Sequence, residues 1–138
     1  MVRAYVLFVA VVTAGAGCAI AVRDASSLVG TWSAAEVPPG GPPCKGPAST
    51  VTYTADGTFT SESANQIVTG TYTARPVTRN SFRVSTKVKS HNGAPNCQGY
   101  SAEYVMSNLV SEFDVEVNGN SARVCVPDIP NVCFTMSR

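Results

Sequence analysis

The chain has 138 residues, with ten basic and nine acidic side chains, one histidine and a formal net charge of +1. This near-neutral balance leaves no basic patch, which removes the electrostatic case for nucleic-acid binding. The length suits one domain, and an odd count of five cysteines requires a separate use for one of them in an exported protein.

Residues 1–17 are typical of a signal peptide. Arg3 gives a weak positive charge, Ala4–Val12 is almost wholly apolar, and small residues follow as far as Gly17. The apolar run is shorter than the about 20 residues that a membrane-spanning helix needs. The segment therefore predicts export, and export permits disulfides.

Cys18 is the predicted lipidation site. The run Gly15-Ala16-Gly17-Cys18 resembles the lipobox at which a bacterial lipoprotein signal is cut and its cysteine acylated. Residues 18–27 would then form a short tether, and the protein would be a cell-envelope lipoprotein at the outer membrane or the cell surface. Ordinary cleavage after Ala16 or Ala21 is the alternative, and it predicts a secreted or periplasmic protein.

Residues 28–138 have the pattern of one β-domain. Thr, Ser, Val, Tyr and Phe recur with period two, and Gly, Pro, Asn and Asp mark the breaks. The strands that this alternation predicts are Leu28–Ala35, Ser49–Thr54, Thr58–Ser63, Ile67–Thr73, Ser81–Val88, Gly99–Met106, Ser111–Val117, Ser121–Val126 and Val132–Ser137. Ala55-Asp56-Gly57 and Asn118-Gly119-Asn120 predict tight hairpin turns.

The predicted fold class is all-β: a small up-and-down antiparallel β-barrel of eight or nine strands. Strands with one wet and one dry face imply antiparallel pairing around one core. Phe113, Val115 and Val117, for example, share one face of their strand. Because a closed antiparallel barrel needs an even number of strands, one of the nine segments is either wrong or an appendage.

Four cysteines allow three disulfide connectivities. Cys125 and Cys133 are symmetric about the intervening loop, in a register that sets Val124 opposite Phe134 and brings the two cysteines within bridging reach. In a meander, the long breaks that carry Cys44 and Cys97 lie at the same end. We therefore predict Cys44–Cys97 and Cys125–Cys133. Free thiols or a metal site are the alternative, which the absence of a CxxC spacing and an oxidising compartment disfavour.

Three short motifs carry a family resemblance. They are Leu28-Val29-Gly30-Thr31-Trp32, the hairpin Tyr53-Thr54-Ala55-Asp56-Gly57-Thr58-Phe59, and Gly70-Thr71-Tyr72. In this order they resemble the small lipocalin-like domains of bacterial lipoproteins, within the lipocalin and calycin group. The resemblance implies a lipocalin-like barrel over residues 28–138.

The same resemblance assigns Trp32 to the barrel base, with Gly30 allowing close backbone approach. In the family an arginine from a late strand often stacks on this tryptophan. Arg123 is the nearest candidate, but it lies on a polar strand face and is not given the role. Avidin-type barrels share Gly-Thr-Trp, yet they enclose biotin with several tryptophans, whereas this chain has one.

No residue pattern predicts catalysis, a metal or a cofactor. His91 is the only histidine and has no second histidine to act with. Glu112, Asp114 and Glu116 lie at period two, which could form a cation site but is typical of a solvated strand face. The chain is therefore predicted not to be an enzyme.

The aromatic residues give the positive indication of a site. The candidate ligand-binding residues inside the barrel are Tyr53, Phe59, Tyr72, Phe82, Tyr104 and Met106. They predict a non-enzymatic protein that binds a small apolar or amphipathic molecule in the barrel. The alternative is a protein-interaction module, such as a protease inhibitor or an envelope assembly factor, with a solid core and functional loops. A cavity of a few hundred Å³ would favour the first, and a filled core with an exposed apolar loop patch the second.

Overall fold

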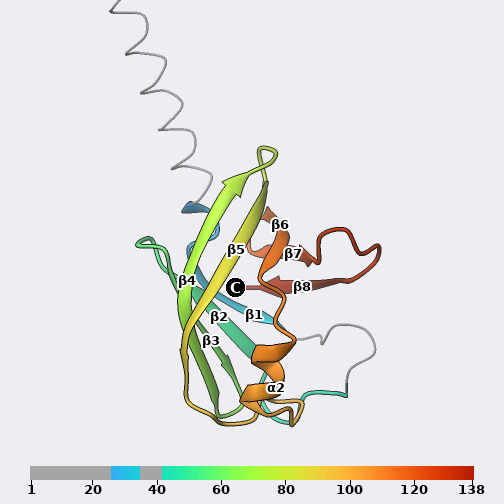
Figure 1. The fold of residues 1–138 in the computed structure, drawn as a ribbon. Coiled ribbons are helices and arrows are strands. Elements are labelled where there is room, and N and C mark those ends of the chain that lie inside the picture. The colour runs from blue at the N-terminus through green and yellow to red at the C-terminus, as the bar shows by residue number, and fades with distance from the viewer. Residues whose placement is uncertain (1–25, 35–41) are drawn as a thin grey trace, which may run out of the picture.

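The fold is a closed barrel of eight antiparallel strands, each paired with its neighbour in sequence and the last paired with the first (Figure 1). The computed structural model describes residues 26–34 and 42–138. The strands are β1 Gly30–Ala34, β2 Ser49–Tyr53, β3 Thr58–Ser63, β4 Gln66–Pro76, β5 Ser81–His91, β6 Glu112–Asn118, β7 Ser121–Cys125 and β8 Cys133–Ser137. The predicted all-β, up-and-down architecture is confirmed, with eight strands.

Period-two alternation sets the register of the barrel wall. In the β6–β7 pair Val115 lies opposite Val124 and Val117 opposite Ala122, and all four are buried. The residues between them, such as Glu116, face outward. A slip of one residue would move every apolar side chain to the wet face, so burial fixes the pairing.

The predicted strand Gly99–Met106 is wrong, because this segment contains a short helix, α2, over Ala102–Ser107. Ser101 is the N-cap, and its side chain accepts a hydrogen bond from the backbone N–H three residues on. Ala102 is buried and Met106 half-buried, at the four-residue spacing of one helix face. The surplus ninth segment is therefore a helix beside the barrel.

The β4–β5 hairpin is longer than predicted. β4 extends the expected Ile67–Thr73 at both ends, and β5 continues three residues beyond Val88. A register shift between Thr69 and Gly70 interrupts the pairing. A Cβ atom at Gly70 would lie 2.1 Å from the Lys87 carbonyl oxygen, so only glycine fits at this bulge.

Both predicted disulfides, Cys44–Cys97 and Cys125–Cys133, are present. Cys125 lies directly opposite Cys133, in the register that also pairs Val124 with Phe134. Two disulfides fit a protein of an oxidising compartment. The predicted signal peptide, Cys18 and the tether up to residue 25 lie outside the described residues, and no helix within the described ranges is long and apolar enough to cross a membrane.

Candidate functional site: a cavity in the barrel

One end of the barrel interior is filled by side chains. The largest fully buried ones are Leu28, Trp32, Phe82, Val84 and Val115. We call this the packed end. The up-and-down topology places here the N-terminal residues 26–29, the β2–β3, β4–β5 and β6–β7 turns, and Arg138. Dense packing of this kind leaves no room for a ligand.

Arg138 closes the packed end over Trp32. Its guanidinium carbon lies 4.5 Å from the centroid of the Trp32 ring, within cation–π range. The same guanidinium donates hydrogen bonds to the carbonyl oxygens of Val29 at 3.1 Å and Gly119 at 3.3 Å. Arg123 is exposed on the outer face. Arg138 could not be predicted from the sequence, because it follows the last strand as a single residue with no pattern around it.

The role of Gly30 differs from the prediction. A Cβ atom there would make an ordinary contact of 3.5 Å with the Arg138 side chain, so room is not the constraint. The constraint is conformational, because Gly30 has a φ of +132°, which side-chain-bearing residues rarely adopt. Glycine lets the chain turn from the N-terminal segment into β1, where the Trp32 indole N–H donates to the Leu28 carbonyl at 2.8 Å.

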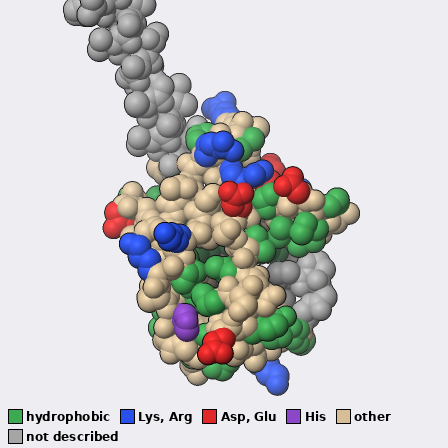
Figure 2. Space-filling model, in the orientation of Figure 1, with side chains coloured by type: hydrophobic (Ala, Val, Ile, Leu, Met, Phe, Trp, Pro, Cys, Tyr) green, Lys and Arg blue, Asp and Glu red, His purple; other side chains and the backbone are tan. Residues whose placement is uncertain are grey.

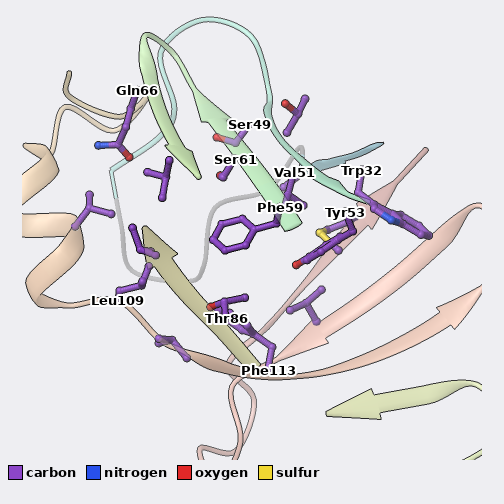
Figure 3. A pocket seen from close by; sticks show the side chains of 18 of the residues that line it. Trp32, Ser49, Val51, Tyr53, Phe59, Ser61, Gln66, Thr86, Leu109 and Phe113 are labelled. Carbon is purple, nitrogen blue, oxygen red and sulfur yellow. The ribbon is translucent and has the colours of Figure 1, made fainter. Parts of the chain in front are cut away.

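The other end of the interior holds a cavity of about 230 Å³ (Figure 3). We call this the hollow end. The residues that line the cavity come from the strands, from α2 and from the chain that follows α2: Trp32, Ala34, Ser49, Thr50, Val51, Tyr53, Phe59, Ser61, Gln66, Val68, Thr86, Val88, Val105, Met106, Leu109, Val110, Phe113, Val124, Phe134 and Met136. Most of these side chains are apolar, which is typical of small-molecule sites.

The cavity borders a gap in the barrel wall. β5 pairs with β6 as far as Ser85 opposite Glu112, and the Thr86 N–H still donates to the Ser111 carbonyl at 2.7 Å, but beyond Thr86 the residues of β5 pair with β4 alone. α2 and the chain after it run across this gap, and Leu109 and Val110 on that chain are 39% and 37% exposed. Figure 2 shows a hollow with hydrophobic side chains in it on this face. The gap offers a small molecule a route to the interior.

The Tyr53 hydroxyl points into the cavity (Figure 3). Tyr53 is only 7% exposed, and no residue in the described ranges hydrogen-bonds its hydroxyl. Its ring packs edge-on against Tyr72 at 4.8 Å between centroids. Burial, and secondarily Tyr72, raises the pKa of Tyr53 to about 12, so the hydroxyl stays protonated at physiological pH. Tyr72 differs, because its hydroxyl donates to the Thr54 carbonyl at 2.6 Å.

Gln66 supplies a second polar group. It is 4% exposed, and its side-chain nitrogen donates to the Ala94 carbonyl at 3.0 Å. That bond orients the amide with its oxygen turned toward the cavity, as Figure 3 shows. Gln66 was not among the predicted site residues, because the predicted strand began at Ile67. The sequence did contain a signal for it. Val68 and Gly70 face inward, and Gln66, two residues before Val68, is expected to face inward as well.

The lining residues include no Asp, Glu, Lys, Arg or His. A charged ligand buried here would therefore have no side chain of opposite charge among them. An unpaired charge is strongly disfavoured in an apolar interior. The cavity is suited to uncharged molecules, with Tyr53, Gln66 and a few hydroxyl groups as its polar contacts.

The six residues predicted to contact a ligand divide into two groups. Tyr53, Phe59 and Met106 line the cavity. Tyr72 and Phe82 are buried in the core but do not line it, and Tyr104 on α2 is 51% exposed and stacks on Tyr100 at 4.7 Å between centroids. Of the other aromatic residues, Trp32, Phe113 and Phe134 also line the cavity.

The other chemically reactive side chains lie away from the cavity. His91 is exposed, and its ring nitrogen Nδ1 accepts a hydrogen bond from the Gly93 N–H at 3.1 Å. Arg83 pairs with Asp114 through two hydrogen bonds, which raise the pKa of Arg83, and lies 3.9 Å from Glu112. Within residues 26–34 and 42–138, no group of three or more His, Cys, Asp or Glu side chains could hold a metal ion.

Comparisons of the chain with protein-family models, curated proteins and solved structures gave no match.

Proposed function

We propose that this protein is an exported, non-enzymatic binding protein that takes up a small apolar or amphipathic molecule inside its barrel. The observation that carries the proposal is the cavity of about 230 Å³ at the hollow end. An eight-stranded barrel is just wide enough to be filled by side chains or to hold one small ligand. Here side chains fill the packed end, and the hollow end has room for a ligand.

We propose further that the protein is a lipocalin-like lipoprotein of the cell envelope, anchored through an acylated Cys18. The two disulfides use four of the five cysteines, which leaves Cys18 for a different modification. A multiply acylated cysteine gives stable attachment, because each buried methylene adds about 0.8 kcal/mol of membrane affinity. Mass spectrometry of the protein from its own host should find a mature N-terminus at Cys18 with an acyl mass. An unmodified N-terminus after Ala16 or Ala21 would refute the anchor.

A protein-interaction module is the second candidate, and exposed apolar side chains in the connections favour it. Tyr104 on α2 is 51% exposed, and Ile129 between β7 and β8 is 53% exposed. Leu109 and Val110 do not add to this argument, because they also line the cavity and their exposure belongs to the gap in the wall. A protein-interaction module would not need the cavity. A variant in which the cavity is blocked therefore distinguishes the two functions.

The test uses Trp32, the only tryptophan, as a reporter inside the cavity wall. Propylbenzene and 1-octanol are titrated into the purified protein while its fluorescence is followed. The matched variants are Ser61→Phe, which places a ring in the cavity, and Thr60→Phe, which places the same ring on the outer face of β3. Adjacent strand residues point to opposite faces, so the pair separates filling the cavity from adding a phenylalanine.

We expect saturable binding of both probes by the native protein and by Thr60→Phe, and a loss of at least tenfold in affinity for Ser61→Phe. Equal binding by both variants would overturn the cavity as the site. No binding of either probe by the native protein would overturn the proposed function itself.

A further inference from the structure

The volume of the cavity limits how much of a ligand the barrel can enclose. A cavity of roughly 150 Å³ in another protein holds benzene, with its six carbon atoms. By the same ratio, about 230 Å³ holds about nine non-hydrogen atoms. This is one ring with a short substituent or a short chain, and it is far smaller than a membrane lipid.

The walls favour a ring. Aromatic side chains contribute flat apolar surfaces from several strands, namely Trp32, Tyr53, Phe59, Phe113 and Phe134. Ring faces and edges attract one another in offset or edge-on arrangements, which adds to simple burial. Since the lining includes no ionisable acid or base apart from the tyrosine, the ring should carry no charge.

Two polar atoms of buried residues face the cavity space, and no described residue forms a hydrogen bond with either of them. The Tyr53 ring lies beside Trp32 and its hydroxyl points away from Trp32 into the cavity, whereas the Gln66 side-chain oxygen lies toward the β3–β4 turn (Figure 3). The tyrosine hydroxyl can donate or accept, whereas the amide oxygen can only accept. A carbonyl oxygen on the ligand could accept a hydrogen bond only from the tyrosine. A hydroxyl on the ligand can form a hydrogen bond with either group.

We propose that the cavity selects a compact, uncharged, single-ring molecule that carries a hydroxyl group, and that the hydroxyl binds Tyr53. The inference rests on the proposed function and defines its ligand class. The body of the ligand packs against Phe59 and Phe113, and its hydroxyl replaces the missing partner of the tyrosine. Gln66 is positioned to accept a hydrogen bond from a second donor on the ligand.

The experiment compares four probes by isothermal titration calorimetry on the purified protein. Propylbenzene has the size and no polar group, and 4-propylphenol adds the hydroxyl. Propylbenzoate, substituted at the same position, replaces the hydroxyl by a carboxylate, and decanoate is a charged chain. We expect 4-propylphenol to bind about twofold to tenfold more tightly than propylbenzene, the range of one net hydrogen bond. Both carboxylates should bind at least about a hundredfold more weakly than 4-propylphenol.

Two conservative variants identify the hydroxyl that acts. Tyr53→Phe should abolish the preference for 4-propylphenol and leave propylbenzene affinity within about twofold. Tyr72→Phe is the matched control, because Tyr72 is equally buried and touches Tyr53 but does not line the cavity. It should keep the preference. Only Tyr72→Phe should lower the stability of the folded protein, because it loses the hydrogen bond to Thr54. Thermal unfolding measures this directly.

Each outcome has a distinct meaning. Stronger binding of decanoate or propylbenzoate than of 4-propylphenol would overturn the ligand class while leaving a small-molecule protein. A preference for 4-propylphenol that survives in Tyr53→Phe would overturn the role of Tyr53. If neither propylbenzene nor 1-octanol binds, the proposed function fails, and the ligand class fails with it.

Discussion

The packed end and the hollow end of this barrel are built from the same strands with different side chains. Along β2 the inward residues shrink from Tyr53 through Val51 to Ser49, and along β3 they shrink from Phe59 to Ser61. Each step lies two residues nearer the hollow end. The difference teaches that a cavity in a small barrel is made by grading side-chain volume along strands, with no change in backbone topology.

Different contacts stabilise the two ends of the barrel. At the packed end, Arg138 and Trp32 join the chain termini of the barrel through stacking and hydrogen bonds. At the hollow end, Cys44–Cys97 links the β1–β2 and β5–β6 connections, and Cys125–Cys133 flanks the β7–β8 connection.

The disulfide loop is also attached to the barrel wall at the hollow end. The Cys97 backbone N–H donates to the Ser63 hydroxyl at 3.0 Å, and that hydroxyl also accepts from Ser49 at 2.9 Å. An unfilled core contributes less burial energy than a packed one, and a crosslink that restricts the unfolded chain compensates for it.

The largest expected difference between the ends is in the cost of removing a phenylalanine. Phe82 at the packed end is 1% exposed, so Phe82→Ala should lower the free energy of unfolding by about 3–5 kcal/mol. Phe113 already borders the cavity, so Phe113→Ala should cost only about 1–2 kcal/mol, mostly lost transfer energy. Urea unfolding of both variants measures the difference. Equal losses would mean that the interior is packed throughout.

Removal of each disulfide in turn should destabilise the protein by unequal amounts. Cys44 and Cys97 are 53 residues apart, and Cys125 and Cys133 are 8 apart. In the chain-entropy model the longer loop is worth about 4 kcal/mol and the shorter about 2.5 kcal/mol. The measurement is urea unfolding of the two paired Cys→Ala variants. Loss of Cys44–Cys97 should also weaken propylbenzene binding, and an unchanged affinity would contradict its role in holding the hollow end.

A pH-dependent effect concerns Tyr53, which lies between the two ends. Its pKa is about 12 in the folded protein and about 10 in an unfolded chain. The folded state therefore binds more protons between these values, and stability falls as pH rises from about 10 to 12. The difference between these two pKa values corresponds to a loss on the order of 3 kcal/mol of stability above the higher one. Tyr53→Phe should remove this part of the pH dependence, and an identical slope in both proteins would contradict the burial of the hydroxyl.

Much of the barrel could be predicted from local sequence patterns. The hairpin at Asp56-Gly57 and the alternation in β6 and β7 specify turns and registers within a few residues of themselves, and both are present. The disulfide pairing followed from the meander, because alternate connections share an end. The α2 segment was missed because Tyr100, Ala102, Tyr104 and Met106 alternate like a strand, while the N-cap Ser101 and the buried Ala102 favour a helix.

The cavity could be predicted only in part. Alternation identifies which side chains face inward, and it placed Tyr53 and Phe59 in the interior. Whether inward side chains fill the space depends on their summed volume against the diameter of the closed barrel, which no local pattern contains. Gln66 and Arg138 were not predicted because each lies at the end of a strand and acts through a contact distant in sequence. Gln66 contacts Ala94, and Arg138 contacts Trp32.

Xenon gives the most direct test of an interior that is packed at one end and hollow at the other. Xenon enters apolar cavities and leaves packed regions empty. A crystal structure determined under xenon pressure should show xenon among Tyr53, Phe59 and Phe113 and none beside Phe82. An interior without xenon, or xenon bound beside Phe82, would contradict the account.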